Sequence, residues 1–286
     1  MVRTGDTAVV CGVRPEILLA SDIPRPYRSV GSTNSNSNSN PLDKATEEAK
    51  EMQELGLLVP NLELSTGCSP AHVPGNAPGS LAQSLTQRVL ALLHSSRVID
   101  GAGLKIEYLA PVAGDDEVLG DADEEDEGAA PVVKAYWTLY IDVLCISLDG
   151  NPFDAAWAAV LAALKDTRLP RAWWDADREM VVCSDKMSEA KRIGLRGLPV
   201  ASTFAVFSPS VQSRRPAESW VLADPDGFEQ DLCQESVTVI MGEDKKILKV
   251  EKNGGGVVGV EEMREIVGQA ETRRDEWKAV IMGPGS

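Results

Sequence analysis

The chain has 286 residues, enough for one large globular domain or two small ones, and enough to bury a sizeable core without disulfides or a structural metal. It carries 28 Lys and Arg against 44 Asp and Glu, a formal charge of −16, which argues against a free-standing nucleic-acid-binding protein because such proteins are usually basic. Aromatic residues make up only 5% of the chain, so a broad base-stacking surface is not expected, although RNA contact inside a larger assembly stays open.

Targeting signals and cysteine usage limit the cellular compartments in which the chain is expected. No apolar run has the length needed to cross a bilayer, and residues 1–20 lack the basic and then apolar pattern of a signal peptide. Five cysteines, an odd number without a Cys-x-x-Cys pair, indicate a reducing compartment and, with only two histidines, argue against a structural zinc site. The residues concerned are Cys11, Cys68, Cys145, Cys183, Cys233, His72 and His94.

The N-terminal part of the chain predicts strands followed by a helix. Residues 7–13 (TAVVCGV) form a β-rich apolar run, typical of a strand buried on both faces, and residues 16–20 continue as a second short strand after Pro15. Another strand is predicted over residues 59–64. Between residues 80 and 96 apolar residues recur at helical spacing, which predicts an amphipathic helix with Ser80 as its N-cap.

A hairpin with an enlarged tip follows. Residues 104–109 alternate apolar and polar, and the long run 134–148 is their natural antiparallel partner. The tip holds residues 114–128 (GDDEVLGDADEEDEG), with nine acids and no base, and is predicted to be a solvated, flexible insert. Residues 29–41, rich in Ser and Asn, are predicted to be a second flexible insert.

The strand over 134–148 ends at Asp149-Gly150-Asn151-Pro152, with Pro152 suited to the first turn of a helix. The helix predicted over residues 153–165 (FDAAWAAVLAALK) is so apolar that it must be buried around most of its circumference.

The second half predicts more strands and a final helix. Strands are expected over 179–183, 201–207 and 219–223, a turn at 224–227, a hairpin over 236–241 and 247–251, and a long amphipathic helix over 260–282. The order of elements indicates a mixed α/β (α+β) fold with sheets packed against helices, not a regular doubly wound nucleotide-binding sheet.

Several segments together resemble the RNase PH family. They are GDTAVVCGVRPEI (5–17), SLAQSLTQRVLALL (80–93), WTLYIDVLCISLDGNPFDAAWAAVLAAL (137–164), LPVASTFAVF (198–207) and LADPDGFEQDLCQESVTVIM (222–241). The strongest, 137–164, has the form typical of the eukaryotic exosome ring. The resemblance implies one RNase PH-like domain over 1–286 (ribosomal protein S5 domain 2-like) and, because family members usually begin with further strands, an N-terminally incomplete one whose sheet edge is exposed.

The same resemblance predicts an inactive site. Active RNase PH enzymes have Asp-Gly-Gly-Thr-Arg at the strand–helix junction, and the Thr and Arg hold the phosphate that attacks RNA. Here Pro152 and Phe153 occupy those positions. Proline donates no N–H and phenylalanine carries no charge, so the side chains that would bind the anion are missing.

The family's catalytic and metal-binding aspartates are also incomplete. A pair six residues apart is required, yet six residues after Asp224 stands the neutral Gln230, and twelve residues after it stands Ser236. Two interpretations stay open: a solvated Asp-Pro-Asp-Gly turn, or a regrouped metal site of Asp224, Asp226, Glu229 and Asp231. The first is favoured, because the phosphate cradle fails independently; no catalytic, cofactor or metal residue is predicted.

Arg88 is the predicted RNA contact, because family members place an arginine of this helix near the central channel. Alternative cations are Arg192, Arg196, Arg214 and Arg215, and at any single one of these five positions an exposed, solvated side chain is the favoured interpretation.

The resemblance therefore implies a non-enzymatic subunit of the six-membered exosome ring. Its expected partners are other RNase PH-type subunits, cap subunits with S1 and KH folds, a separate 3′→5′ exonuclease, and RNA threaded through the pore. Its expected role is support of RNA processing and degradation, including ribosomal RNA maturation, in nucleus, nucleolus and cytoplasm. The alternative is a residual phosphate-dependent 3′→5′ exoribonuclease that uses the shifted acids.

Overall fold

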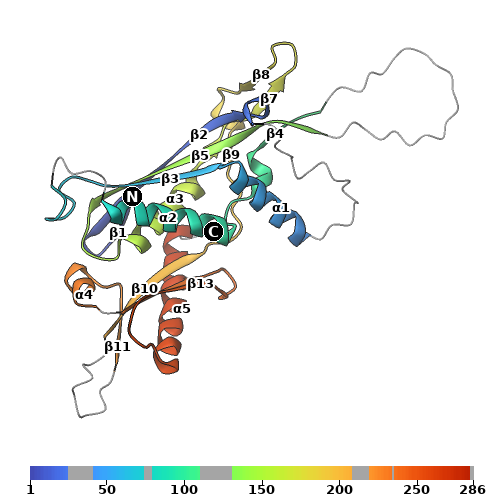
Figure 1. Ribbon diagram of the computed structural model, residues 1–286. Helices are drawn as coiled ribbons and strands as arrows, with labels where there is room; N and C mark the ends of the chain where they lie inside the picture. The colour runs from blue at the N-terminus through green and yellow to red at the C-terminus, as the bar shows by residue number, and fades with distance from the viewer. Residues whose placement is uncertain (25–40, 74–78, 110–130, 208–218, 234, 284–286) are drawn as a thin grey trace, which may run out of the picture.

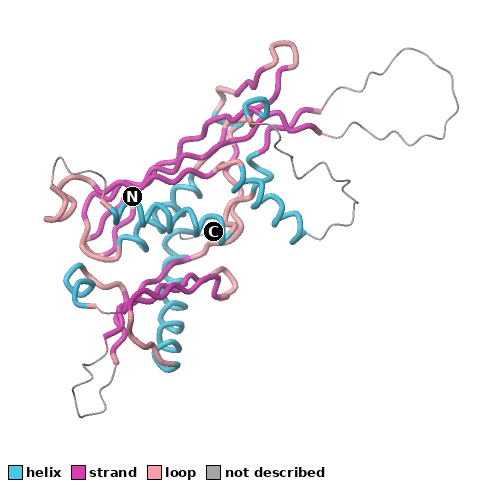
Figure 2. The backbone as a smooth tube through the Cα atoms, viewed as in Figure 1, coloured by secondary structure: helices cyan, strands magenta, loops and turns pink. Residues whose placement is uncertain are grey.

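The computed structural model describes the chain except for residues 25–40, 74–78, 110–130, 208–218, 234 and 284–286. Two β-sheets enclose a layer of helices, and a long C-terminal helix covers the outer face of the second sheet (Figures 1 and 2). The predicted mixed α/β layered architecture is thus confirmed. The two predicted inserts, 114–128 and all of 29–41 except Pro41, lie outside the described residues.

The first sheet has five strands in the order β1-β2-β5-β3, with β4 also paired to β5. Its members are β1 (Val2–Thr4), β2 (Thr7–Leu19), β3 (Leu58–Leu64), β4 (Lys105–Tyr108) and β5 (Val132–Ser147). β4 runs antiparallel to β5, as the hairpin prediction required. Strand β2 is continuous, so the expectation of two strands separated at Pro15 was wrong. β1 pairs only with Thr7–Val9, so at Pro15 the edge of β2 that faces away from β5 has no described partner strand. A proline is tolerated there because its missing N–H has no strand to bond to.

The helical layer consists of α2 (Ser80–Ser96) and α3 (Pro152–Asp166). α3 packs against β2 and β5 on one side and β10 on the other, and the Trp157 indole N–H donates to the Pro199 carbonyl oxygen at 2.7 Å. Contact with both sheets explains why its apolar residues surround the helix, as predicted. Pro152 occupies the first turn of α3. The N-cap of α2 is Gly79, so the assignment of Ser80 as the cap was wrong: Ser80 is already the first helical residue.

The second sheet has the order β11-β10-β12-β13 and is antiparallel throughout. It comprises β10 (Val200–Phe207), β11 (Trp220–Ala223), β12 (Glu235–Met241) and β13 (Ile247–Gly254). Helix α5 (Val260–Met282) buries Ile266 and Ala270 against Phe204, Val237 and their neighbours, which makes a second, smaller core. The predicted final hairpin and helix are confirmed.

Some short elements were not predicted from the sequence. Helix α1 (Pro41–Glu54) begins at the end of the expected 29–41 insert, and its Glu51 accepts from the Tyr136 hydroxyl at 2.7 Å and pairs with Lys105 at 2.6 Å. Helix α4 (Gly227–Leu232) follows the predicted turn. Two small ribbons pair β6 (Arg168–Leu169) with β9 (Lys191–Arg192), and β7 (Ala172–Asp175) with β8 (Met180–Cys183). Of these four strands only β8 was predicted, over 179–183, and it is confirmed. The 3-10 turns are η1 (Ala20–Asp22), η3 (Gly101–Leu104) and η4 (Met187–Glu189).

Membrane-spanning helices and disulfides are both absent from the described residues. Within the described part of the chain, no helix combines the length and the apolar character of a membrane span. All five cysteines are free thiols, and burial raises the pKa of Cys11 to about 12 and that of Cys145 to about 11, with the Asp142 and Cys68 charges adding to the respective shifts.

Candidate functional site

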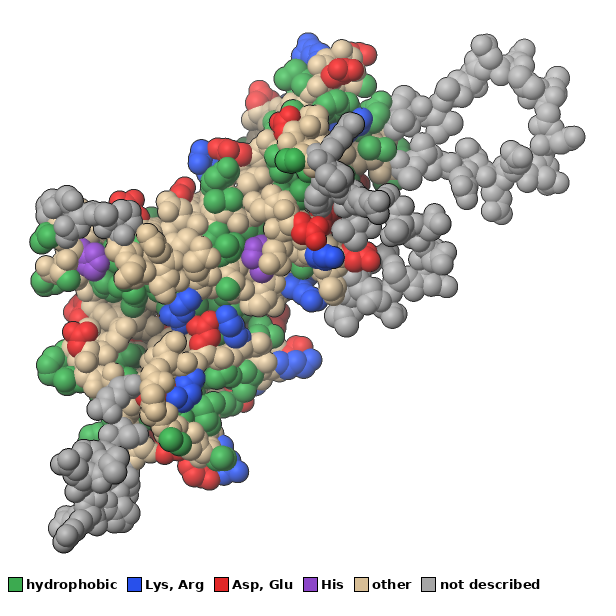
Figure 3. All heavy atoms as spheres, viewed as in Figure 1, with side chains coloured by type: hydrophobic (Ala, Val, Ile, Leu, Met, Phe, Trp, Pro, Cys, Tyr) green, Lys and Arg blue, Asp and Glu red, His purple; other side chains and the backbone are tan. Residues whose placement is uncertain are grey.

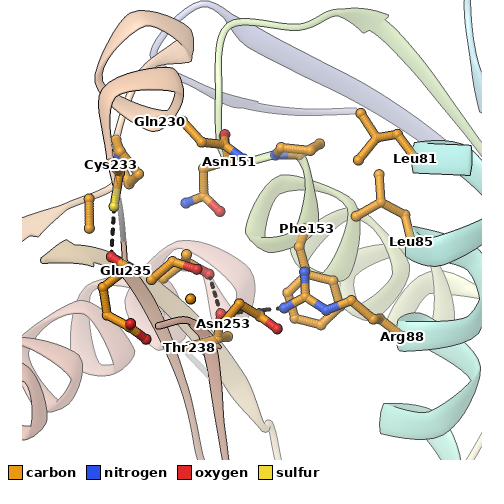
Figure 4. Close-up of a pocket in the computed structure, with 16 residues that line it drawn as sticks. Leu81, Leu85, Arg88, Asn151, Phe153, Gln230, Cys233, Glu235, Thr238 and Asn253 are labelled. Carbon is orange, nitrogen blue, oxygen red and sulfur yellow. Dashed lines mark hydrogen bonds between the residues drawn. The ribbon is translucent and has the colours of Figure 1, made fainter. Parts of the chain in front are cut away.

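A cleft of about 410 Å³ opens where the β5–α3 junction, the start of α2 and the second sheet meet (Figure 4). The residues that line it come from α2, the junction, α4 and its flanks, and strands β10, β12 and β13. They are Leu81, Leu85, Arg88, Asn151, Pro152, Phe153, Thr203, Ala205, Pro225, Gln230, Cys233, Glu235, Ser236, Thr238, Asn253 and Gly254. The cleft thus brings together the positions that the sequence singled out in three distant segments.

The backbone of the junction is fixed by a close approach to the turn before α4. Gly150 has φ +79°, and a Cβ there would lie 2.3 Å from the Pro225 carbonyl oxygen, so only glycine fits. The Gly227 N–H donates to the Asp149 carboxylate at 3.2 Å, and the Thr7 hydroxyl donates to the Gly150 carbonyl at 2.8 Å. The Asp-Gly unit therefore ties β5, β2 and the turn into one rigid support for the cleft.

Asn151 is the polar centre of this support. Its side-chain amide donates to Asp154 at 2.8 Å and to Asp224 at 2.6 Å, and its backbone N–H donates to the Gln230 side-chain oxygen at 3.1 Å. The amide oxygen Oδ1 is buried and has no hydrogen-bond partner among the described residues. Asn151 thus occupies two of the carboxylate oxygens that a divalent cation would need, and Gln230 serves as an acceptor for the junction.

The carboxylate of Asp154 lies beneath the cleft, wholly buried. Burial raises its pKa, and hydrogen bonds from Asn151 and Thr203 together with the charge of Arg273 oppose the shift. Thr203 donates through its backbone N–H at 2.7 Å and its hydroxyl at 2.8 Å. Arg273 of α5 lies 3.9 Å from Asp154 and 3.7 Å from Asp224. This network links α3, the turn and α5.

Three of the four acids that could have formed a metal site have other roles, and the fourth, Asp231, is exposed. Asp224 is held by Asn151 and Arg273 with only a quarter of its side chain exposed, so the expectation that it is a solvated turn residue was wrong. Asp226 is the N-cap of α4: it accepts from the Glu229 N–H, and the Glu229 carboxylate accepts from the Asp226 N–H in a capping box. Among the residues the structure describes, no group of three or more His, Cys, Asp or Glu side chains could hold a metal ion.

Arg88 reaches the cleft from α2, but its guanidinium already has partners. Its guanidinium donates to one oxygen of Glu251 at 2.8 and 2.9 Å and to the Thr238 hydroxyl at 3.3 Å, and it stacks on the Phe153 ring with its Cζ 3.8 Å from the ring centroid. Burial works against the charge of Glu251, but the hydrogen bonds from Lys249 and Arg88 outweigh it and lower the pKa of Glu251. On the face shown in Figure 3, basic and acidic side chains adjoin one another at the waist between the two sheets. Whether Arg88 contacts RNA stays a prediction.

The alternative cations differ in their surroundings. Arg196 is paired with Glu48 at 2.6 Å and with Asp100 at 2.5 Å, which occupies it in joining α1 to the loop before β10. Arg214 and Arg215 lie outside the described residues. Arg192 is exposed on β9, far in the fold from the α4 side of the cleft (Figure 1). Glu251, Asp154 and Arg273 were missed, because pairing across more than a hundred residues leaves no local signal.

The match to a known family rests on the segment that carries the junction. Residues 1–170, more than half of the chain, match the 3′ exoribonuclease family (RNase PH), domain 1. The chain belongs to the RNase PH family. This confirms the resemblance that the five quoted segments predicted, and with it the RNase PH-like fold.

Curated RNase PH relatives include exosome components. The chain is 31% identical over 255 residues to the exosome complex component rrp43 of Schizosaccharomyces pombe, which covers 89% of this chain and 70% of that protein. The segments LCISLDGN and LPVASTFAVF also point, by resemblance, to this subunit among the ring proteins. Human exosome complex component RRP45 is 25% identical over 75% of this chain, which spans 39% of that longer protein.

Solved structures show the same RNase PH-like fold. A chain of the Archaeoglobus fulgidus exosome with RNA bound to the active site aligns with a TM-score of 0.58 at 20% identity, over 96% of this chain and 81% of that one. A chain of an archaeal exosome core aligns with a TM-score of 0.54 at 19% identity. At these identities the likeness establishes the fold alone.

Proposed function

We propose that this chain is a non-catalytic subunit of the RNase PH-type ring of an RNA exosome. It supports 3′→5′ processing and degradation of RNA, including ribosomal RNA maturation, by a nuclease on another subunit. The observation that carries the proposal is the state of the cleft. Pro152 and Phe153 stand at the anion positions, and Arg88, the one cation lining the cleft among the described residues, is ion-paired with Glu251.

Phosphorolysis makes specific demands on such a cleft. Inorganic phosphate must be held beside the scissile ester by cations and N–H donors that have no other partner, because each prior partner must first be displaced. Pro152 has no N–H, the Asn151 N–H is engaged by Gln230, and the Arg88 guanidinium shares a carboxylate with Lys249. These contacts favour a rigid support over a reacting site.

Exposed apolar side chains on the second sheet and its helices favour a role within an assembled particle. β13 is an edge strand of the second sheet, and its Ile247, Leu248 and Val250 are between 44 and 48% exposed. Elsewhere in this half of the molecule Trp220 on β11, at the opposite edge of the sheet, Phe228 on α4 and Val260 on α5 are each about 70% exposed, and hydrophobic side chains are visible over this lower part of the molecule in Figure 3. An edge strand with exposed apolar side chains is a template for pairing with another chain. We assign this region to contacts with neighbouring ring subunits.

The remaining assignments follow the resemblance. Cap subunits with S1 and KH folds and a 3′→5′ exonuclease are the proposed partners above and below the ring, with RNA threaded between them. The proposed locations are nucleus, nucleolus and cytoplasm, which fluorescence microscopy of the tagged chain in its host would test.

Catalysis is tested with the pure chain and with the assembled particle. Each is incubated with a labelled oligoribonucleotide, inorganic phosphate and Mg²⁺, and nucleoside diphosphates are measured. We expect no release above a blank from the chain alone. Release by the chain alone that depends on phosphate would overturn the non-catalytic assignment in favour of a residual exoribonuclease.

Assembly is tested independently by purifying the tagged chain from its host and measuring the mass and composition of the complex. We expect a particle that contains other RNase PH-type subunits. Recovery of a stable monomer at micromolar concentration would contradict the ring proposal.

A further inference from the structure

A second pocket, remote from the cleft, is strongly basic. It has a volume of about 280 Å³ and lies among η3, β4, β5, β9 and the segment from β6 to β7, at the end of the molecule opposite α4 and α5 in Figure 1. Four of its lining residues are cations, namely Lys105, Arg171, Lys191 and Arg192, and none of its lining residues is acidic. In a chain of charge −16, such a cluster indicates a site for an anion.

Two of these four cations have no carboxylate partner among the described residues, and a third has only a weak one. Lys191 and Arg192 are exposed, and neither side chain has an ion pair or hydrogen bond with a described residue. The nearest carboxylate oxygen of Glu189 lies 3.9 Å from Arg171, whose side chain is 66% exposed. Lys105 alone is firmly paired, with Glu51 at 2.6 Å. The pocket therefore offers two cations without a partner, and a third, Arg171, whose only carboxylate contact is long and exposed.

The β6–β9 ribbon adds an unfavourable like-charge pair. Arg168 stands directly opposite Arg192 in the antiparallel register, and Leu169 stands opposite Lys191. Side chains of directly opposed residues extend from the same face about 5 Å apart, and like charges in that arrangement destabilise a sheet. An anion bound between the ribbon and Arg171 would relieve that repulsion.

An exposed aromatic side chain adjoins the same cations. Trp173 on β7 is 41% exposed and lies two residues beyond Arg171, on the same face of the extended chain. The Arg171 guanidinium carbon is 6.0 Å from the Trp173 ring centroid. A flat exposed ring beside an arginine suits a base next to its phosphate, because every base has a face that stacks on an indole.

We propose that this pocket binds the phosphates of single-stranded RNA through Arg171, Lys191 and Arg192, with one base stacked on Trp173. That the ligand is RNA rests on the proposed function, whereas the choice of an anion rests on the pocket itself. The site is separate from the cleft and from Arg88.

The test uses the full chain within its assembled particle and a fluorescent 15-nucleotide oligouridylate. The variant Arg171→Gln/Lys191→Gln/Arg192→Gln removes the three cations. The control Arg3→Gln/Lys246→Gln/Arg264→Gln removes the same charge from exposed side chains that each pair with a neighbouring acid. Three phosphate contacts on a single strand predict a slope of about −2 for log affinity against log salt. Relative to the parent particle, whose other subunits also contact RNA, we expect the triple variant to lose this contribution of about −2 to the slope and at least about tenfold in affinity at low salt, while the control keeps both.

Trp173→Ala separates stacking from charge. We expect affinity to fall about fivefold or more with the salt slope unchanged, since stacking one base on an aromatic side chain contributes roughly 1–3 kcal/mol. A 4-thiouridine oligonucleotide should crosslink to the peptide that contains Trp173, and the crosslink should disappear in the triple variant.

Equal affinity of the triple variant and the control would overturn the proposal. So would displacement of the RNA by polyglutamate of equal charge as effectively as by unlabelled RNA, which would assign the pocket to an acidic protein. Particle assembly is measured separately by native mass spectrometry. A chain that binds RNA through these residues but joins no ring supports the pocket and overturns the ring proposal.

Discussion

The cleft at the β5–α3 junction and the basic pocket by the β6–β9 ribbon both contain arginines, but in opposite states. In the cleft, Arg88 is fixed by Glu251 and Phe153, and it serves to join α2 and α3 to the second sheet. In the pocket, Arg171, Lys191 and Arg192 stay largely unpaired. A cation whose charge is met inside the fold contributes to stability, whereas one without a partner is available to a ligand. The two regions can therefore be separated by measurement.

The largest expected effect comes from restoring the family's phosphate residues in the cleft. Phe153 is 2% exposed in the main core, directly under the Arg88 guanidinium. In Pro152→Thr/Phe153→Arg the lost packing alone costs about 3–5 kcal/mol, and the new charge lies beside Arg88. We expect denaturant unfolding to show at least that loss, with Pro152→Thr alone costing less, and no phosphorolysis. A stable double variant that releases nucleoside diphosphates would show that the cleft needs only two side chains to react.

A smaller effect is expected when the acidic partner of the cleft is removed. Glu251→Ala leaves Arg88 and Lys249 without their shared carboxylate in a partly buried place, which costs about 1–3 kcal/mol. The matched control is Glu261→Ala, which breaks an ion pair of similar length to Arg264 on the open surface, and is expected to cost no more than about 0.5 kcal/mol. Equal losses in the two variants would remove the structural role assigned to Arg88.

The pH dependence of the free energy of unfolding tests the same Arg88–Glu251 ion pair. The pKa of Glu251 in the folded chain lies below its ordinary value of 4.5, so its contribution is fully present above that pH and is lost as the pH falls through the folded-state value. Asp154 acts in the opposite sense: burial raises its pKa, so the folded environment favours the protonated carboxyl and its contribution to stability grows as the pH falls. We expect Glu251→Gln to flatten the acid limb of the free energy of unfolding below pH 4.5 relative to the parent chain. An unchanged acid limb would contradict the pairing.

The smallest effect is expected in the basic pocket. Arg171→Gln, Lys191→Gln and Arg192→Gln should each change the free energy of unfolding by no more than about 0.5 kcal/mol, and Arg192→Gln should be neutral or slightly stabilising because it removes the repulsion with Arg168. Thermal unfolding of the three single variants measures this. Losses as large as that of Glu251→Ala would mean that these cations are structural, and the contrast between the two regions would fail.

Much of the architecture was predictable because it depends on local patterns. The apolar spacing of 80–96 and the two-sided apolar character of 153–165 place α2 and α3 almost to the residue, and α5 is recovered over 260–282. The short ribbons β6–β9 and β7–β8 and helix α4 were missed or only partly found, since two to six residues carry too little periodicity. Pro15 misled the prediction of β2, because its effect depends on which edge of the strand has a partner.

By itself the sequence determined which residue types stand at the junction. Pro152 and Phe153 exclude an N–H donor and a charge wherever the chain folds, and glycine at 150 permits a positive φ. Only the tertiary structure decided which charges meet. Arg88 and Glu251 are 163 residues apart, and Asn151 reaches Asp224 across 73 residues, while Arg192 finds no acid among the described residues. Electrostatic pairing depends on the distance between charges in space. The packing of the two sheets around α3 sets that distance, and the spacing of residues along the chain does not reveal it.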